Sequence, residues 1–281
     1  MKIGIFDSGM GGLSVLHRAL RMIPEADFLY YADEEHVPYG EKTREQVRGY
    51  IDEIIAFMIK KQVDAIVIAC NTATAAGLEA AQQTFDIPII GVIEPGARAA
   101  ARATLNRRVG VIATKGTVES GVYTRAIRNI DAGITVFSTA TPRFVEIAEL
   151  GIRMAKGPIE NYTSLASKVY IRPAFQEIAQ DYLDPLRRSE IDTLVLGCTH
   201  FPLLKALIGG VIGSHVRLIS SAKEVSLDCK DLLIRRESLA HPGHIPLYQF
   251  ASSDPDVDEF ASFGERVLRM PLGEVLYAPL D

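Results

Sequence analysis

Hydrophobic residues along this chain follow two alternating spacings. Short runs of β-branched and aliphatic residues, typical of buried strands, are each followed by a longer segment with apolar residues three or four positions apart, typical of helices. The clearest helical pattern covers residues 44–61, where one face carries Val47, Ile51, Ile54 and Met58. Alternation of this kind predicts an α/β fold built on mainly parallel sheets.

The predicted elements fall into two groups along the chain. Strands are expected at residues 2–6, 28–32 and 87–92, in the runs that end at Cys70 and Cys198, around Val109 and Ile134, and at 216–220. Helices are expected at residues 13–23, 44–61, 72–84, 144–150 and 202–208, and in part of 156–187. Residues 223–281 contain a helix and a strand-like segment at 246–250, which we expect to complete the first sheet.

A turn signal separates the two groups. Pro95-Gly96 follows the strand at 87–92, and a Pro-Gly pair punctuates regular structure. We therefore expect a first domain of residues 1–97 plus 223–281, and a second domain of residues 98–222.

One phrase occurs twice in the sequence. Asp64-Ala65-Ile66-Val67-Ile68-Ala69-Cys70 matches Asp192-Thr193-Leu194-Val195-Leu196-Gly197-Cys198, and upstream the strand at 2–8 matches 108–114. The two pairs are offset by 128 and 106 residues (198 − 70 and 108 − 2). Buried parallel strands resemble one another in any α/β protein, but two pairs in the same order favour an internal duplication.

Composition narrows the class of protein. The chain has 281 residues, 48% of them hydrophobic and 23% charged, which is globular composition. Its net charge of −5, without a dense Lys/Arg run, disfavours nucleic-acid binding. No run reaches the roughly 18 apolar residues of a membrane helix, and the chain opens on a short strand, so we expect a cytoplasmic protein without a membrane partner.

The cysteines are the candidate reactive groups. There are three, with no Cys-x-x-Cys pair, so a disulfide framework is not expected in the cytoplasm. Cys70 and Cys198 each stand at a strand end where a helix is expected to begin, a position that stabilises a thiolate. A thiolate can accept a proton and a thiol can donate one. Cys229 has helical periodicity around it and is expected in the core.

Two other interpretations of these cysteines stay open. They could be small buried hydrophobes, the commonest fate of an intracellular cysteine. Cys70, Cys198 and His200 could also supply a Cys2His zinc set, although Cys198-Thr199-His200 is a short spacing and no fourth ligand is evident.

Four motifs together resemble the glutamate racemase family, within the cofactor-independent aspartate/glutamate racemase superfamily. They are Phe6-Asp7-Ser8-Gly9-Met10-Gly11-Gly12, Pro38-Tyr39-Gly40, Ala69-Cys70-Asn71-Thr72-Ala73 and Gly197-Cys198-Thr199-His200-Phe201-Pro202. The resemblance implies two pseudo-symmetric α/β domains with the active site in the cleft between them. It also implies interconversion of L- and D-glutamate, which supplies D-glutamate for peptidoglycan synthesis, with no cofactor and no metal.

The resemblance also assigns roles to residues. Cys70 and Cys198 would be the two acid/bases, with Asp7 assisting Cys70 while Glu149 and His200 assist Cys198. Without the motifs, each of the three assisting residues has an ordinary structural explanation, such as a helix cap, a solvated residue or a core histidine. Glutamate would be bound mainly by neutral donors; the expected binding residues are Asp7, Ser8, Pro38, Tyr39, Gly40, Asn71, Thr72, Thr114, Thr117, Thr199 and His200.

Two further functions remain as alternatives. The first is a racemase or isomerase of the same superfamily that acts on aspartate or another diacid. The second is a non-catalytic amino-acid binding protein, in which paired acid/base groups would serve no purpose. The sequence leaves open whether the chain forms a homodimer.

Overall fold

The computed structural model describes residues 1–154, 172–236 and 244–280. The chain folds into two compact units, one formed by Met1–Val92 with Ala222–Asp281 and the other by Ile93–Ser221. The domain limits expected at residues 97 and 222 fall inside helices α4 (Ile93–Ala103) and α10 (Ser221–Arg235). Pro95 does not break α4 because proline is tolerated in a first helical turn.

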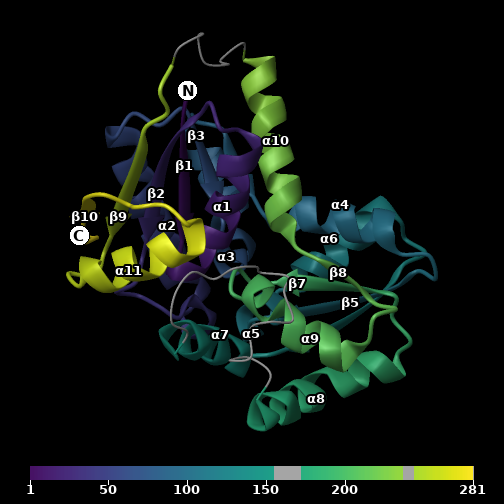
Figure 1. Ribbon diagram of the computed structural model, residues 1–281. Helices are drawn as coiled ribbons and strands as arrows, with labels where there is room; N and C mark the ends of the chain where they lie inside the picture. Colours follow the sequence, from purple (N-terminus) through teal and green to yellow (C-terminus); the bar gives the residue numbers. More distant parts are fainter. Residues whose placement is uncertain (155–171, 237–243, 281) are drawn as a thin grey trace. The chain divides into compact units, whose positions relative to one another are not determined.

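The first unit contains a parallel six-stranded sheet in the order β10-β9-β2-β1-β3-β4 (Figure 1). Its strands are β1 (Lys2–Asp7), β2 (Asp27–Ala32), β3 (Ala65–Ile68), β4 (Ile89–Gly91), β9 (Tyr248–Ser252) and β10 (Val275–Tyr277). Its helices are η1 (Met10–Gly12), α1 (Leu13–Met22), η2 (Tyr39–Glu41), α2 (Arg44–Lys60), α3 (Asn71–Thr84), α10 and α11 (Val257–Leu268).

Helix α2 illustrates how local sequence sets these elements. Thr43 caps it, since the Thr43 side chain accepts from the Gln46 N–H and the Gln46 side chain accepts from the Thr43 N–H. The apolar face predicted from its spacing is buried against the sheet, with Ile54 and Met58 fully covered. The predicted and observed bounds of this helix differ by one residue.

The second unit contains a parallel four-stranded sheet in the order β6-β5-β7-β8. Its strands are β5 (Arg108–Ala113), β6 (Thr135–Ala140), β7 (Thr193–Gly197) and β8 (Arg217–Ile219). Its helices are α4, α5 (Lys115–Glu119), α6 (Val122–Ile130), α7 (Arg143–Met154), α8 (Pro173–Arg188), η3 (Phe201–Leu204) and α9 (Lys205–Ile212). The part of the predicted helical stretch 156–187 before residue 172 lies outside the described residues. Two parallel sheets flanked by helices confirm the predicted α/β class.

The two sheets share an order and a register. The order β2-β1-β3-β4 in one matches β6-β5-β7-β8 in the other. Ile3 pairs with Ala65, and Val109 pairs with Thr193, which are equivalent positions under the two sequence offsets. Since chance similarity of buried strands would not fix the register, the match supports the duplication inferred from sequence.

The aspartate that opens each repeated phrase has the same task in both units. The Asp64 carboxylate accepts from the Lys2 N–H at 2.7 Å, and the Asp192 carboxylate accepts from the Asn106 N–H at 2.7 Å. Each carboxylate therefore satisfies a backbone donor: the first residue of β1 in one unit, and a residue two positions before β5 in the other.

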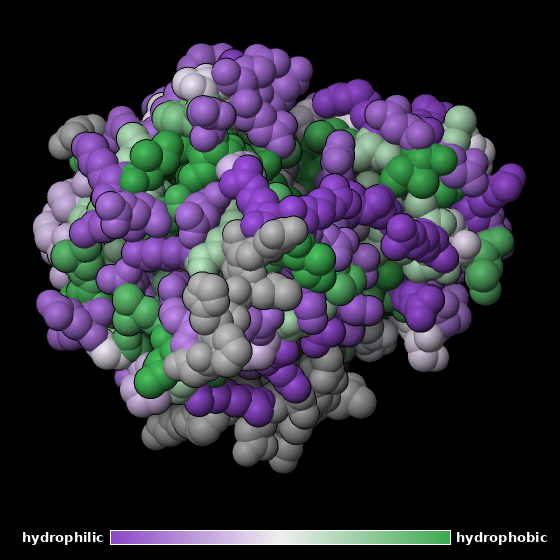
Figure 2. Space-filling model, turned by 90° about the horizontal axis from the view of Figure 1, so that it is seen from above, coloured by the Kyte–Doolittle hydropathy of each residue, from purple (hydrophilic) through white to green (hydrophobic). Residues whose placement is uncertain are grey.

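The C-terminal region returns to the first sheet, as expected. β9 pairs with β2, and β10 pairs with β9; Figure 1 draws β9 in yellow-green and β10 in yellow. The sequence interpretation gave this region one helix and one strand, and it missed α11 and β10. The face in Figure 2 has hydrophilic and hydrophobic residues interspersed. Within the described residues, no helix has the length and apolar character needed to cross a membrane.

Candidate active site

Cys70 lies at the junction of β3 and α3. It is the N-cap residue of α3, and its Sγ accepts a hydrogen bond from the Ala73 N–H at 3.4 Å. The thiol is buried, with 5% of the residue exposed. A sulfur at a helix N-terminus is surrounded by backbone donors and the positive end of the helix dipole, which favour its anionic form.

The end of β1 brings a second set of polar groups to this thiol. β1 is the neighbour of β3 in the sheet, and the Cys70 thiol donates to Ser8 Oγ at 3.6 Å. Asp7, fully buried, accepts from the Gly12 N–H at 2.9 Å. A Cβ at Gly12 would lie 2.4 Å from the Asp7 Cβ, so only glycine leaves room for this carboxylate.

Tyr30 lies beneath the same loop, a residue that the sequence interpretation did not single out. Its hydroxyl donates to the Gly9 carbonyl at 2.8 Å. Burial raises the Tyr30 pKa well above its ordinary value, and the charges of Asp7, Glu34 and Cys70 raise it further. The hydroxyl therefore stays protonated and holds the loop that contains Gly9 and Gly12, whose N–H donates to Asp7.

Cys198 follows β7 but has a different local structure. The prediction that it starts a helix is only partly right: a turn through Thr199 and His200 precedes the short 3-10 helix η3, and α9 begins at Lys205. The Cys198 Sγ lies 3.8 Å from the His200 Nδ1. The His200 ring thus contacts the sulfur of Cys198, whereas the sulfur of Cys70 accepts from the Ala73 N–H of a helix.

His200 links this thiol to Glu149. Its Nε2 lies 3.2 Å from the Glu149 Oε1, so Cys198, His200 and Glu149 form a chain of contacts. Burial by itself would lower the His200 pKa, but the contacts with Cys198 and Glu149 outweigh it and raise that pKa well above its ordinary value. A protonated imidazole beside a thiol stabilises the thiolate and can hold its proton.

Tyr123 and Gly197 shape the surroundings of Cys198, and the sequence interpretation missed both roles. The Tyr123 pKa is raised, mainly by burial, with a contribution from the Cys198 charge. A Cβ at Gly197 would come 2.8 Å from the Ile112 carbonyl oxygen and 3.1 Å from the Tyr123 ring. The strand end that presents Cys198 is therefore packed too closely for a side chain at Gly197.

The remaining predicted binding residues lie at the carboxyl ends of the two sheets, where open α/β sheets bind ligands. Asn71 and Thr72 form the first turn of α3, and both are buried. Thr114 follows β5, and its Oγ1 lies 3.0 Å from the Thr117 Oγ1. Thr199 is buried beside Cys198.

Pro38, Tyr39 and Gly40 lie in the first unit, after β2. Tyr39 begins η2 and is buried, and its hydroxyl donates to Asp33 at 2.5 Å. The hydroxyl is thus engaged within the protein, and substrate binding by the backbone around Gly40 stays a prediction.

The structure thus collects the predicted residues into one set for each sheet. Asp7, Ser8, Cys70, Asn71, Thr72 and residues 38–40 belong to the first unit, whereas Thr114, Thr117, Glu149, Cys198, Thr199 and His200 belong to the second. Among the described residues, no group of three or more His, Cys, Asp or Glu side chains has the arrangement of a metal site.

Comparisons with known proteins point to one family. A family model described as Asp/Glu/Hydantoin racemase matches residues 11–225. The chain is 41% identical over 279 residues to a glutamate racemase from Geobacter metallireducens, covering 99% of this chain and 97% of that protein.

Solved structures give the same result. A glutamate racemase isoform from Bacillus anthracis matches with a TM-score of 0.85 and 34% identity, covering 99% of this chain and 97% of that one. A glutamate racemase from Francisella tularensis, solved in complex with D-glutamate, also has a TM-score of 0.85, with 31% identity, 100% of this chain and 98% of that one covered.

Proposed function

The chain belongs to the Asp/Glu/hydantoin racemase family, and on that premise we propose that it interconverts L- and D-glutamate by a two-base mechanism. The observation that carries the proposal is the pair of buried thiols at matching strand ends, each with its own polar partners. Glutamate is the substrate named for relatives that span nearly the whole chain.

In the mechanism, one cysteine acts as base and the other as acid. The thiolate removes the Cα proton and leaves the C–H electron pair on carbon as a carbanion. The second cysteine, as a thiol, gives its proton to the opposite face of Cα, which yields the other enantiomer. One proton leaves Cα and one proton is added to it, so the composition of the substrate does not change. In the reverse reaction the two cysteines exchange roles.

The two thiols are activated by different groups. The α3 N-terminus stabilises the thiolate of Cys70, and Asp7, at the end of the neighbouring strand, is the carboxylate that can take the thiol proton. His200, held by Glu149, holds the proton of Cys198 or stabilises its thiolate. Each side therefore has a charge partner of its own, as general acid/base chemistry near neutral pH requires.

Binding of the substrate uses mainly neutral donors. The two carboxylates accept from the hydroxyls and amides of Ser8, Asn71, Thr72, Thr114, Thr117 and Thr199 and from the backbone N–H groups around Gly40. His200 adds a charged donor, and Asp7 accepts from the ammonium. Neutral donors bind a carboxylate without the positive charge of an Arg or Lys side chain. The charged groups of the substrate then stay accessible to the residues that stabilise the carbanion in the transition state. In the cell, the D-glutamate formed would serve peptidoglycan synthesis. A homodimer stays a prediction.

Incubation of the purified protein with each glutamate enantiomer in deuterated water tests the proposal. We expect loss of optical rotation and incorporation of deuterium at Cα, at equal rates with and without a chelator. L-aspartate in a parallel reaction tests the alternative substrate. If the protein exchanges the Cα proton of aspartate and not that of glutamate, the alternative substrate replaces the proposed one.

A further inference from the structure

A buried carboxylate lies close to the segment 38–40 and belongs to none of the motifs. Asp33 follows directly after β2, and its side chain is fully buried. Removing a carboxylate from water costs several kcal/mol unless hydrogen-bond donors surround it. The donors around Asp33 therefore identify the segments of the chain that this carboxylate holds in place.

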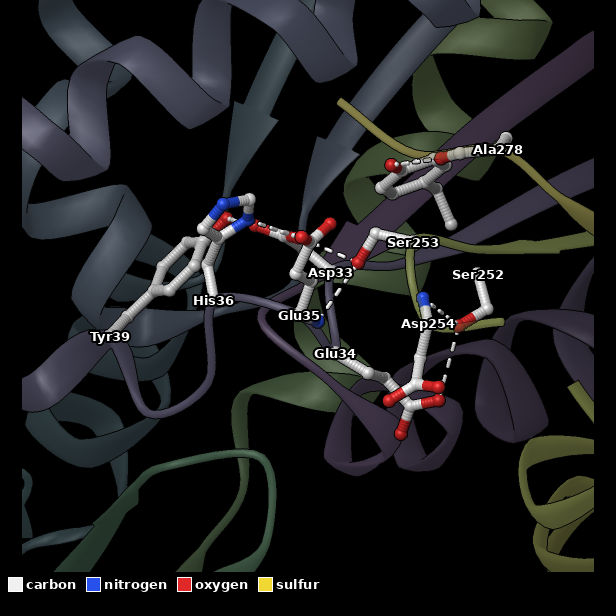
Figure 3. A network of polar contacts seen from close by, with 10 residues as sticks. Asp33, Glu34, Glu35, His36, Tyr39, Ser252, Ser253, Asp254 and Ala278 are labelled. Carbon is white, nitrogen blue, oxygen red and sulfur yellow. Dashed lines mark hydrogen bonds and ion pairs between the residues drawn. The ribbon is translucent and has the colours of Figure 1, made fainter. Parts of the chain in front are cut away.

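Within the described part of the chain, three side chains contact the Asp33 carboxylate, as Figure 3 shows. Tyr39 donates to Oδ2 at 2.5 Å, Ser253 donates to Oδ1 at 2.8 Å, and the His36 Nδ1 lies 2.8 Å from the same Oδ1. Burial raises the Tyr39 pKa well above its ordinary value, and Asp33 raises it further, so the hydroxyl keeps the proton that it donates.

The trio of Asp33, His36 and Ser253 is not a hydrolytic triad. In such a triad the serine hydroxyl bonds the imidazole, and the imidazole bonds the carboxylate. Here the Ser253 hydroxyl and the His36 ring both contact the carboxylate itself. The serine is not activated as a nucleophile, and the network holds chain segments together instead.

The segments that it holds are the loop after β2 and the end of β9. Asp33 contacts His36 and Tyr39, three and six residues further on, and so fastens the loop to its own first residue. Ser253, directly after β9, donates to Asp33 and accepts from the Glu35 N–H at 3.0 Å. The His36 ring also stacks on Tyr50 of α2 with centroids 4.0 Å apart. The loop that leads to Pro38, Tyr39 and Gly40 is thus held by contacts with Asp33, with Ser253 after β9 and with Tyr50 of α2.

We propose that Asp33 is a positioning residue for the substrate-binding segment Pro38-Tyr39-Gly40. It acts through Tyr39 and His36, and fixes the backbone N–H groups around Gly40 that bind a glutamate carboxylate. The inference rests on the proposed function and adds that the C-terminal strand β9, through Ser253, supports the substrate site.

Steady-state kinetics of Asp33→Asn, Tyr39→Phe and the double variant test this role. Asp33→Asn keeps the shape of the side chain but replaces one carboxylate oxygen with an NH2 group. That group would face a neighbouring donor where the oxygen accepted a hydrogen bond. We expect KM to rise about tenfold for both glutamate enantiomers with a smaller change in kcat, since a binding segment is displaced while the thiols stay in place. Because the variants remove the same hydrogen bond, the double variant should raise KM by less than the product of the two single effects.

Asp27→Asn is the matched control. Asp27 begins β2, at the opposite end of the strand, and it too ties β2 to the C-terminal region, by accepting from the Leu247 N–H at 2.7 Å and contacting the His244 Nε2 at 2.9 Å. This variant should lower Tm and leave KM unchanged. The control separates loss of stability from loss of positioning.

The outcomes separate this inference from the proposed function. A folded Asp33→Asn protein with the wild-type KM, or a double variant whose two effects multiply fully, would overturn the role of Asp33 while racemisation by the wild type stands. If Asp33→Asn does not fold, an unchanged KM in Tyr39→Phe overturns the role just as well. A wild-type protein that does not racemise glutamate would overturn the proposed function, and the inference with it.

Discussion

The two cysteines follow matching strands but have unlike partners. Cys70 caps a helix and contacts the Ser8 hydroxyl, whereas Cys198 contacts the ring of His200. A helix N-terminus stabilises a thiolate without carrying a proton, while an imidazole can also store one. We therefore expect the two proton-transfer steps to be unequal.

Stability should depend on pH through His200. Its pKa is raised in the folded protein, so its contribution to the free energy of unfolding is fully present below about 6.5, the ordinary pKa, and is lost as pH rises through the folded pKa. Urea unfolding of the wild type and of His200→Gln between pH 5 and about 9 measures this contribution as a difference. The difference should shrink as the pH rises.

His17 provides a control of opposite sign. Burial lowers its pKa, and so do Arg21, Arg269 and Arg18. Its effect on stability should therefore improve with rising pH until about 6.5, the ordinary pKa, is reached. A difference for His200→Gln that grows with pH, parallel to that of His17→Gln, would contradict the raised pKa of His200.

Single residues could be predicted only where their role is local. The strand-end positions of Cys70 and Cys198 follow from the hydrophobic pattern, and the resemblance supplied Glu149 and His200. Asp33 was missed, because its partner Ser253 is 220 positions away and no local spacing marks the pair. Tyr30 was missed for the same reason, since its hydroxyl holds a loop 21 positions earlier.

At the scale of elements, the helices and strands with several hydrophobic periods could be predicted. The 44–61 helix and the strands at 2–6 and 28–32 match the structure to within one residue. β10 has three residues and was missed, whereas β4 and β8, which are equally short, lie inside the longer predicted segments 87–92 and 216–220. Pro95-Gly96 was interpreted as a break because a Pro-Gly pair usually marks a turn between regular elements. Here the two residues lie within the first turns of α4.

The β1–α1 connection should tolerate no side chain at Gly12. A Cβ there would lie 2.4 Å from the Asp7 Cβ and 2.6 Å from the Tyr30 hydroxyl. Gly12→Ala should lower the free energy of unfolding by roughly 1–3 kcal/mol and reduce kcat, because Asp7 is displaced. Chemical denaturation and racemisation assays on the same preparation check both effects.

Gly49→Ala is the control for this substitution. Gly49 lies in α2, where an added Cβ meets no atom within 4 Å, so alanine should raise the free energy of unfolding by about 0.5–1 kcal/mol. An equal response of the two variants would mean that the connection has room for a side chain and that Asp7 is not held by close packing.

At the scale of the molecule, the chain contains the same four-stranded arrangement twice. Both units keep the strand order and the register, and the first adds β9 and β10 at one edge. The duplication could be inferred from two repeated phrases, but the different polar groups at the two strand ends could not. Those groups come from α7 and the turn after β7 in one unit, and from the end of β1 and the start of α3 in the other. A repeated scaffold with unlike partners is suited to two related but unequal proton transfers.

The most direct test of this account is the racemisation rate of three cysteine variants. Cys70→Ser and Cys198→Ser should each reduce the rate by roughly 10³-fold or more, since a serine hydroxyl is too weak an acid to replace either thiol. Cys229→Ser is the control, because Cys229 is buried in α10 and burial raises its pKa to about 12; its rate should match the wild type. Substantial racemisation by Cys70→Ser or Cys198→Ser would contradict the two-thiol mechanism.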